Sequence, residues 1–260
     1  MIRHRTWPWT LLSLTMLGAA WVVVTWPFAD GPIVQDLFLP GPTELWSGFI
    51  DLATTGYKGR PLLSHIGFSL ERVLAGFVTG TVVGTLLGLL MGVRPWFSAL
   101  LGPFIEFLRP LPQLGYLVLL IVWFGIGETS RIVLLFLAAL PVAAVAAQSG
   151  VRNVPPQRIQ VARSLGASDW QIFRHVVFPS ALEEIFTGAR LAIGIVYATL
   201  IAAEIIAGST GVGWMILDAG RFLRSDYVFV GIALIGLLGL VLDRLLLAAQ
   251  QQWIHWAGRQ

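Results

Sequence analysis

The chain has 260 residues, of which 56% are hydrophobic and only 12% are charged. A soluble domain carries about twice that share of charged residues, so the composition predicts an integral membrane protein. The arginines are scattered and Lys58 is the single lysine, which argues against nucleic-acid binding, and the absence of cysteine excludes disulfides and thiolate chemistry.

Uncharged apolar runs of membrane-spanning length predict the spans. They cover residues 6–29, 73–93, 110–127 and 132–151. Two further candidates, residues 185–206 and 227–247, are apolar but carry isolated charges. The simplest count is six transmembrane helices, with residues 95–108 leading into the third. A signal peptide is the alternative for the first run, but its length favours a retained span.

The distribution of arginine and lysine predicts the orientation. With a cytoplasmic N-terminus, six spans place most of the basic residues of the loops and termini inside, so both termini are expected in the cytoplasm. Residues 1–64 then form an N-terminal helix and an external segment, and residues 65–260 form a core of five helices. Within the external segment, Thr43 is the candidate N-cap of a short helix.

Glycines recur at every fourth position of the second span. They are Gly76, Gly80, Gly84, Gly88 and Gly92. Four residues advance a helix by about 400°, so these glycines form a slowly drifting ridge. Small residues let two helix backbones approach closely. The ridge predicts a close helix crossing, within the subunit or alternatively between subunits.

Three prolines interrupt the third segment, at Pro103, Pro110 and Pro112. Irregular backbone at membrane depth is tolerated only where it is buried in protein or lines a cavity. Glu106 and Arg109 precede the break, share a helix face and are expected to be able to pair. They are either functional groups of a translocation path or a structural ion pair.

The fifth span contains Tyr197 and Glu204. A glutamate deep in an apolar helix must be protonated, paired or facing water. Arg190 lies about 21 Å away along the helix, which is too far for a partner. We therefore expect Glu204 near the external end of the span, paired across subunits or hydrated. A loop of residues 208–227 follows, and its Gly211 and Gly213 are typical of a turn rather than a phosphate-binding cradle.

A polar interval, residues 152–184, separates the fourth and fifth spans and carries several helix signals. The start signals are Pro155 with Pro156, and the capping-box pairs Ser168 with Gln171 and Ser180 with Glu183. Gly166 separates two expected short helices, residues 155–165 and 169–178, and Pro179 is expected to end the second. We predict a folded cytoplasmic docking surface.

No catalytic pattern accompanies these features. The histidines are far apart, no ligand cluster has metal-binding spacing, and no nucleophile elbow occurs. Lys58 lies in GYKGR, so the chain has no Walker A sequence. The sequence therefore predicts neither a catalytic residue nor a metal nor a bound nucleotide in this chain.

The interval IQVARSLGASDWQIFRHVVFP resembles the EAA loop of ABC importer permeases. The spacing matches throughout, whereas the identities depart from the family pattern at Gln160, Val161 and Phe178. The resemblance implies that the residues of this loop couple to an ATPase. They are Gln160, Val161, Ala162, Arg163, Ser164, Gly166, Ala167 and Pro179.

The resemblance covers residues 65–247 and favours one branch of the family. PFIEFLRPLPQLGYLVLLIVWFGIGETSRI and GARLAIGIVYATLIAAEIIAGSTGVGWMI look like the permeases for taurine, aliphatic sulfonates and nitrate, with the taurine permeases nearest. This implies an all-α integral membrane fold, with six transmembrane helices of type I ABC importer (MetI-like) topology and a cytoplasmic coupling-helix loop.

The function implied is that of a non-catalytic permease subunit in the bacterial inner membrane, moving a small organosulfonate, taurine first, from periplasm to cytoplasm. The implied partners are a second permease copy, two ATPase subunits that hold ATP and Mg, an external solute-binding protein and membrane lipid. Candidate residues of the translocation path are Glu106, Arg109, Gln113, Tyr197 and Glu204.

Several alternatives remain open at this point. Within the same architecture, the cargo is an aliphatic sulfonate, nitrate or bicarbonate. Outside the family, the chain is a proton-coupled secondary transporter that uses Glu204, or an intramembrane enzyme that uses Glu204 or the pair Glu106 and Arg109.

Overall fold

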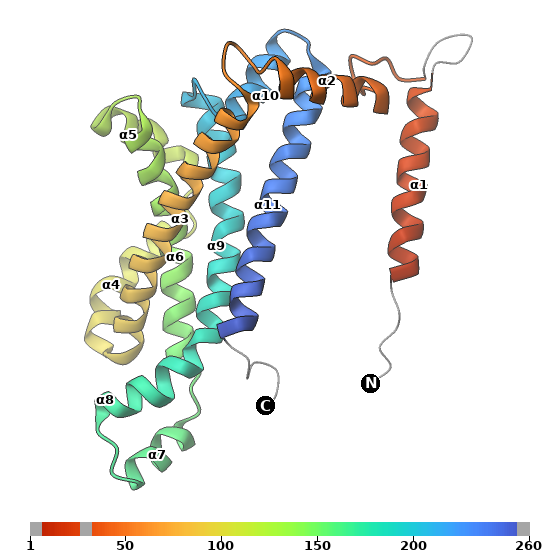
Figure 1. Ribbon diagram of the computed structural model, residues 1–260. Helices are drawn as coiled ribbons and strands as arrows, with labels where there is room; N and C mark the ends of the chain where they lie inside the picture. The colour runs from red at the N-terminus through yellow and green to blue at the C-terminus, as the bar shows by residue number, and fades with distance from the viewer. Residues whose placement is uncertain (1–6, 27–32, 254–260) are drawn as a thin grey trace.

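The computed structural model describes residues 7–26 and 33–253, and the regular elements of these residues are helices (Figure 1). In chain order they are α1 (Trp7–Thr25), α2 (Pro42–Thr54), α3 (Leu62–Val93), α4 (Pro95–Leu108), the 3₁₀ helix η1 (Gln113–Tyr116), α5 (Leu117–Phe124), α6 (Glu128–Arg152), α7 (Pro156–Ser164), α8 (Asp169–Ile172), the π-helix η2 (Phe173–Val177), α9 (Phe178–Ala207), α10 (Val212–Arg221) and α11 (Ser225–Trp253). The fold is all-helical, as predicted.

Four helices are long and apolar enough to cross a membrane. They are α3, α6, α11 and the continuous run Asp169–Ile206. A fifth candidate is the broken pair of α4 with η1 and α5, whose two arms are bent by 95°. The predicted proline break in the third segment is therefore confirmed. Helix α1 is shorter than the predicted first span, whose residues 6 and 27–29 lie outside the described residues.

The glycine ridge of α3 packs directly against the backbone of α6. A Cβ atom at Gly84 would lie 2.4 Å from the carbonyl oxygen of Leu140, and one at Gly88 would lie 2.1 Å from that of Ala144. Real Cβ atoms do not approach this closely, so these positions accept only glycine without a shift of a helix. The predicted close crossing is confirmed, and it joins two helices of the same chain.

The two largest apolar clusters hold most of the bundle together. The first joins α3, α6 and α9 through buried side chains such as Val73, Leu135 and Val196. The second lies at the end of the bundle that carries α2 and α10, and includes Leu52 and Met215 (Figure 1). The core therefore runs along the α3–α6–α9 contact and is closed at one end by two short helices.

Two expectations about local structure are wrong. Helix α2 begins at Pro42 with Gly41 in the N-cap position, and the hydroxyl of Thr43 bonds instead to the Glu44 carboxylate. Proline suits the first turn because its φ is preset and its missing N–H would be unpaired there, so the N-cap lies two residues earlier than predicted. The expected loop of residues 208–227 contains α10, whose apolar face packs into the second cluster.

Two glycine-to-alanine substitutions test the crossing. We expect Gly84→Ala to lower the free energy of unfolding by roughly 1–3 kcal/mol, because the added methyl group overpacks the α3–α6 contact. The matched control is Gly236→Ala in α11, where an added Cβ meets nothing within 4 Å. It should leave stability unchanged or raise it by up to about 1 kcal/mol. Unfolding by SDS titration in mixed micelles measures both, and equal effects would contradict the crossing.

Candidate functional site

The loop between α6 and α9 has a tightly specified turn at its centre. Gly166 has φ +79°, the left-handed conformation that glycine adopts at little cost. Its N–H donates to the Arg163 carbonyl at 2.9 Å, and the Ala167 N–H donates to the Ala162 carbonyl at 3.1 Å. These two bonds form a Schellman motif that ends α7. The predicted separation of two helices at Gly166 is confirmed.

The second half of the loop begins at the predicted capping box. The Ser168 N–H donates to the Gln171 side chain at 2.8 Å, and the Gln171 N–H donates to the Ser168 hydroxyl at 3.4 Å. The N–H groups of the N-cap and of the third helical residue of α8 are thereby paired. Loop geometry is therefore set by sequence signals at both sides of Gly166.

The expected end of the second helix at Pro179 is wrong. The chain continues from α8 through η2 into α9, so residues 169–206 form one helical run of 38 residues. Proline has no N–H to donate to residue 175, and the π-helical turn just before it accommodates this missing bond. Ser180 therefore lies inside a helix, where the predicted capping box with Glu183 has no helix start to cap.

The loop exposes large apolar side chains beside its turn. Val161, Leu165 and Trp170 are 61%, 82% and 65% exposed. Gln160, Arg163, Ser164 and Gly166 are also exposed, whereas Pro179 is half-buried and lines, with Val161 and Leu165, a groove of about 530 Å³ between α7 and η2. Ala162 and Ala167 are half-buried against the loop's own small core of Val154, Ile172 and Val177. Contiguous exposed apolar residues mark an interaction surface.

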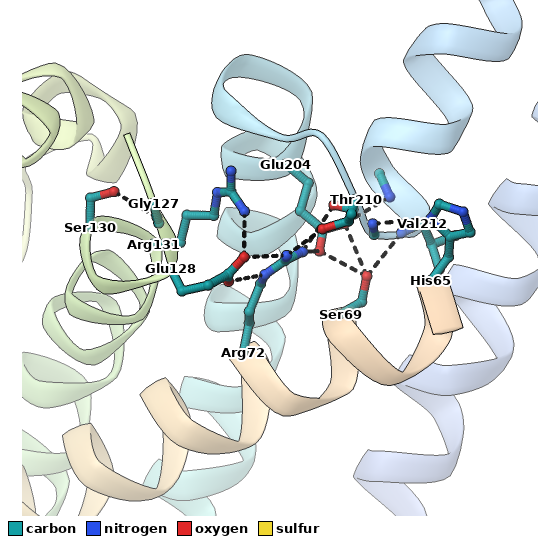
Figure 2. A network of polar contacts seen from close by, with 12 residues as sticks. His65, Ser69, Arg72, Gly127, Glu128, Ser130, Arg131, Glu204, Thr210 and Val212 are labelled. Atoms are coloured by element: carbon teal, nitrogen blue, oxygen red, sulfur yellow. Dashed lines mark hydrogen bonds and ion pairs between the residues drawn. The ribbon is translucent and has the colours of Figure 1, made fainter. Parts of the chain in front are cut away.

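A charge network, buried except for the exposed Glu128, lies where α3, α6 and α9 meet (Figure 2). Arg72 of α3 is 2% exposed. Its Nε and Nη2 donate to the Glu128 carboxylate at 2.5 and 2.7 Å, and its Nη1 donates to Glu204 at 2.6 Å. The remaining N–H groups reach the carbonyl and hydroxyl oxygens of Thr210 at 3.0 and 2.8 Å. Every N–H of this guanidinium is thus paired.

Glu204 is fully buried, and its carboxylate accepts bonds from two other helices, α3 and α10. Besides Arg72, the Ser69 hydroxyl donates to it at 2.8 and 3.0 Å and the Gly213 N–H donates at 2.8 Å. The expectation that Glu204 is hydrated or paired across subunits is wrong, because its partner is an arginine of the same chain. A Cβ atom at Gly211 would lie 2.2 Å from the carboxylate, so glycine is required there.

Arg72 is not among the site residues predicted from the sequence. A signal was present, because Arg72 immediately precedes the uncharged run of residues 73–93 and lies inside the first turns of a membrane helix. An arginine in such a position needs a buried counter-charge. Its partner Glu204 is 132 positions away, so no local pattern connects the two.

The network is electrically balanced. Arg131 also donates to Glu128, at 2.9 Å, so two arginines and two glutamates share one cluster. Removing one partner from a buried pair leaves an uncompensated charge, which is far more costly than the net worth of the pair. The cluster therefore fixes α3, α6, α9 and the segment before α10 to one another.

The other candidate path residues do not converge with Glu204. Glu106 and Arg109 form no side-chain bond with each other in the described part of the chain, so the expected pairing is wrong; both are exposed and line a separate cavity. Gln113 is half-buried in η1, and Tyr197 is half-buried against Gly239 of α11. Among residues 7–26 and 33–253, no three His, Cys, Asp or Glu side chains form a metal-binding group.

A polar contact holds α10 in place at the end of the bundle. Asp218 accepts bonds from Lys58 Nζ at 2.7 Å and from the Tyr57 hydroxyl at 2.8 Å. Burial alone would raise the pKa of Asp218, but these bonds outweigh it and hold the pKa below its ordinary value. Burial, reinforced by Asp218, raises the pKa of Tyr57. The ionised carboxylate thus anchors the helix whose first residues contact Glu204.

Comparison with known proteins agrees with this arrangement. The model of the family described as "Binding-protein-dependent transport system inner membrane component" matches residues 61–254. The chain belongs to this family. It is 38% identical to the taurine transport system permease protein TauC of Escherichia coli K12, over 98% of this chain and 95% of TauC. It is 37% identical to the putative aliphatic sulfonates transport permease protein SsuC of the same organism, over 90% and 88% of the two chains.

A solved structure has the same fold as this chain. A chain of the MetNI methionine ABC transporter, in an inward-facing conformation, superposes with a TM-score of 0.60 at 22% identity, over 72% of this chain and 95% of that one. The MetI-like helical fold is thereby shown, and the chain is a multi-pass membrane protein of an ABC transporter family.

Substitutions in the network test its role in the fold. We expect Glu204→Leu to lower the free energy of unfolding by roughly 3–5 kcal/mol, since it leaves Arg72 with an unbalanced charge. Replacing Arg72 by leucine as well should restore part of that loss. SDS titration of the purified permease measures both variants.

The control for this prediction is an arginine–carboxylate pair that joins two long helices but is not buried. Arg190 and Asp243 join α9 to α11 at 3.0 Å, and their side chains are 36% and 38% exposed. Asp243→Asn should therefore stay close to the wild type, because solvent screens the pair. If Asp243→Asn were as damaging as Glu204→Leu, burial would not be the cause.

Proposed function

We propose that this chain is the transmembrane permease subunit of a type I ATP-binding cassette importer that moves a small organosulfonate, taurine first, from periplasm to cytoplasm. The observation that carries the proposal is the loop of residues 152–184, a stiff, exposed pair of helices continuous with a long apolar helix. The likeness to TauC over almost the whole chain supports taurine as the cargo.

The proposed complex follows from the resemblance to type I importers. Two copies of this chain form a homodimer of six spans each, with α1 as the first span and both termini in the cytoplasm of a cell whose inner membrane holds it. Two cytosolic ATPase subunits bind ATP and Mg, and an external solute-binding protein delivers the cargo. The permease itself carries out no chemistry on its cargo, and membrane lipid covers apolar side chains such as Leu14 and Leu17 of α1.

The geometry supports a route by which ATP hydrolysis moves the spans. A load on α7 passes through the Schellman turn at Gly166 into α8, which is helically continuous with α9. Helix α9 carries Glu204, whose bond to Arg72 extends the rigid body to α3, and Glu128 extends it to α6. The exposed coupling residues Gln160, Val161, Arg163 and Ser164 contact the ATPase in this proposal, and Ala162, Ala167 and Pro179 support them from behind.

The translocation path in this proposal lies beside the broken third span and the fifth span. Glu106, Arg109 and Gln113 belong to the broken segment, and Tyr197 belongs to α9. Glu204 does not contact the cargo in this proposal, since its carboxylate already accepts bonds from Arg72, Ser69 and Gly213. Its role is to hold α9 against α3 and α10. A proton-coupled transporter that uses Glu204 as carrier is disfavoured, because this buried carboxylate has no exposed surface from which to exchange a proton.

Uptake by the reconstituted complex tests the proposal. We expect the chain, co-expressed with its ATPase and supplied with the solute-binding protein, to import labelled taurine into proteoliposomes only with ATP, and an uncoupler of the proton gradient should have no effect. Uptake driven by a proton gradient without ATP would instead support a secondary transporter. Uptake of an aliphatic sulfonate, nitrate or bicarbonate in place of taurine would contradict taurine as the cargo but would keep the assignment as an importer permease.

A substitution at the loop turn tests coupling. We expect Gly166→Val to leave the complex folded but to lower transport per ATP hydrolysed at least about tenfold, because valine cannot hold the left-handed backbone and the helices on either side reorient. The matched control is Gly59→Val, at a glycine with φ +77° that likewise has open space around its Cβ position. Coupling ratios are measured from parallel uptake and phosphate release. Equal coupling ratios in the two variants would show that the turn at Gly166 is not needed for coupling.

A further inference from the structure

Helix α4 lies near the end of the bundle that carries the α7–α8 loop (Figure 1). A polar cavity lies beside this helix. It has a volume of about 310 Å³ and is lined by α4 and by the last turns of α3 and α6. Its polar lining residues are Ser98, Glu106, Arg109, Gln148 and Arg152. Small-molecule sites have volumes of about 300–1,000 Å³, so a small organic ion fits. None of these residues belongs to the Arg72 network.

Two opposite charges in this cavity are left without partners. The carboxylate of Glu106 and the guanidinium of Arg109 form no side-chain hydrogen bond or ion pair with any described residue, although they are three positions apart on α4. Side chains at this spacing are neighbours and commonly pair. Both groups are therefore available to a ligand that carries both signs of charge.

Another part of the cavity wall is organised around the hydroxyl group of Ser98, which lies on α4 two turns before Glu106. Ser98 Oγ accepts a bond from Gln148 Nε2 at 3.0 Å and another from an Nη2 of Arg152 at 2.8 Å. A hydroxyl that accepts twice still has its own O–H to donate. The guanidinium of Arg152 uses one N–H in this contact. Its other N–H groups and its positive charge are available to an anion in the cavity.

We propose that this cavity is a binding subsite for a zwitterionic aminosulfonate on the cytoplasmic half of the permease. Arg152, with the hydroxyl of Ser98, binds the sulfonate oxygens, and Glu106 binds the ammonium group. Arg109, one turn beyond Glu106, adds positive charge to the cavity and so attracts the anion. This inference rests on the proposed function, because it takes the cargo class from there. The inference goes beyond the proposed function because it names the residues that recognise the cargo and the chemistry they use.

The charge pattern makes Glu106 the residue that determines specificity. Guanidinium groups bind sulfonates and carboxylates alike by charge-assisted hydrogen bonds. A carboxylate in the same cavity repels any simple anion and attracts only one that also carries a cation. The subsite should therefore prefer taurine over ethanesulfonate, which has the same sulfonate and no ammonium group.

Binding to the purified permease–ATPase complex, without nucleotide and without the external binding protein, tests the subsite. Tritiated taurine is measured by scintillation proximity, with unlabelled taurine and ethanesulfonate as competitors. We expect Arg109→Gln and Arg152→Gln each to weaken taurine binding about tenfold or more. Glu106→Gln should weaken taurine to a similar extent while leaving ethanesulfonate unchanged or tighter, so the preference for taurine disappears.

The control is Arg94→Gln, an exposed arginine at the start of the same helix that does not line the cavity. It should bind taurine like the wild type, and size-exclusion profiles check that every variant still assembles. Unchanged taurine binding in the arginine variants, or an unchanged preference in Glu106→Gln, would overturn the subsite.

ATP-dependent uptake separates this inference from the proposed function. If the complete wild-type transporter imports taurine but the complex shows no saturable binding, the subsite is overturned and the proposed function stands. If neither uptake nor binding of taurine occurs, both are overturned.

Discussion

The guanidinium of Arg72 is the interaction on which the rest of the structure depends. It is buried in an apolar helix, where an arginine is tolerated only if its charge is balanced and its N–H groups are bonded. Glu128, Glu204 and Thr210 meet both needs, and they come from three different segments of the chain. The requirement of one side chain therefore fixes the relative positions of α3, α6, α9 and the turn before α10.

Close backbone packing and helical continuity extend this fixed point along the molecule. The glycines of α3 let it lie against α6 over several turns, so the two helices move together. At the other end, the π-helical turn before Pro179 keeps α8 continuous with α9. A break at that proline would have separated the loop from the span that carries Glu204. Because the run is unbroken, a single continuous helix connects the loop to the charge network.

Features that depend on neighbouring residues could be predicted from the sequence. Four of the six predicted spans, the ridge beginning at Gly76, the turn at Gly166 and the capping box at Ser168 all follow from local spacing. Features set by distant contacts could not. Arg72 and Glu204 meet only through the packing of α3 against α9, and α10 forms because its apolar face finds the second cluster. The capping box predicted at Ser180 was wrong, because such a motif marks the start of a helix and Ser180 lies inside α9.

The contrast between two kinds of arginine bears on where a cargo is held. Arg72 carries full charge, but every donor is committed to the protein, so an incoming sulfonate would have to displace a buried carboxylate. Arg109 and Arg152 line an open cavity with donors to spare, and a ligand there replaces water rather than a counter-charge. Rigidity and recognition are thus assigned to different residues, which lets the permease move as a body without releasing the bonds that hold it together.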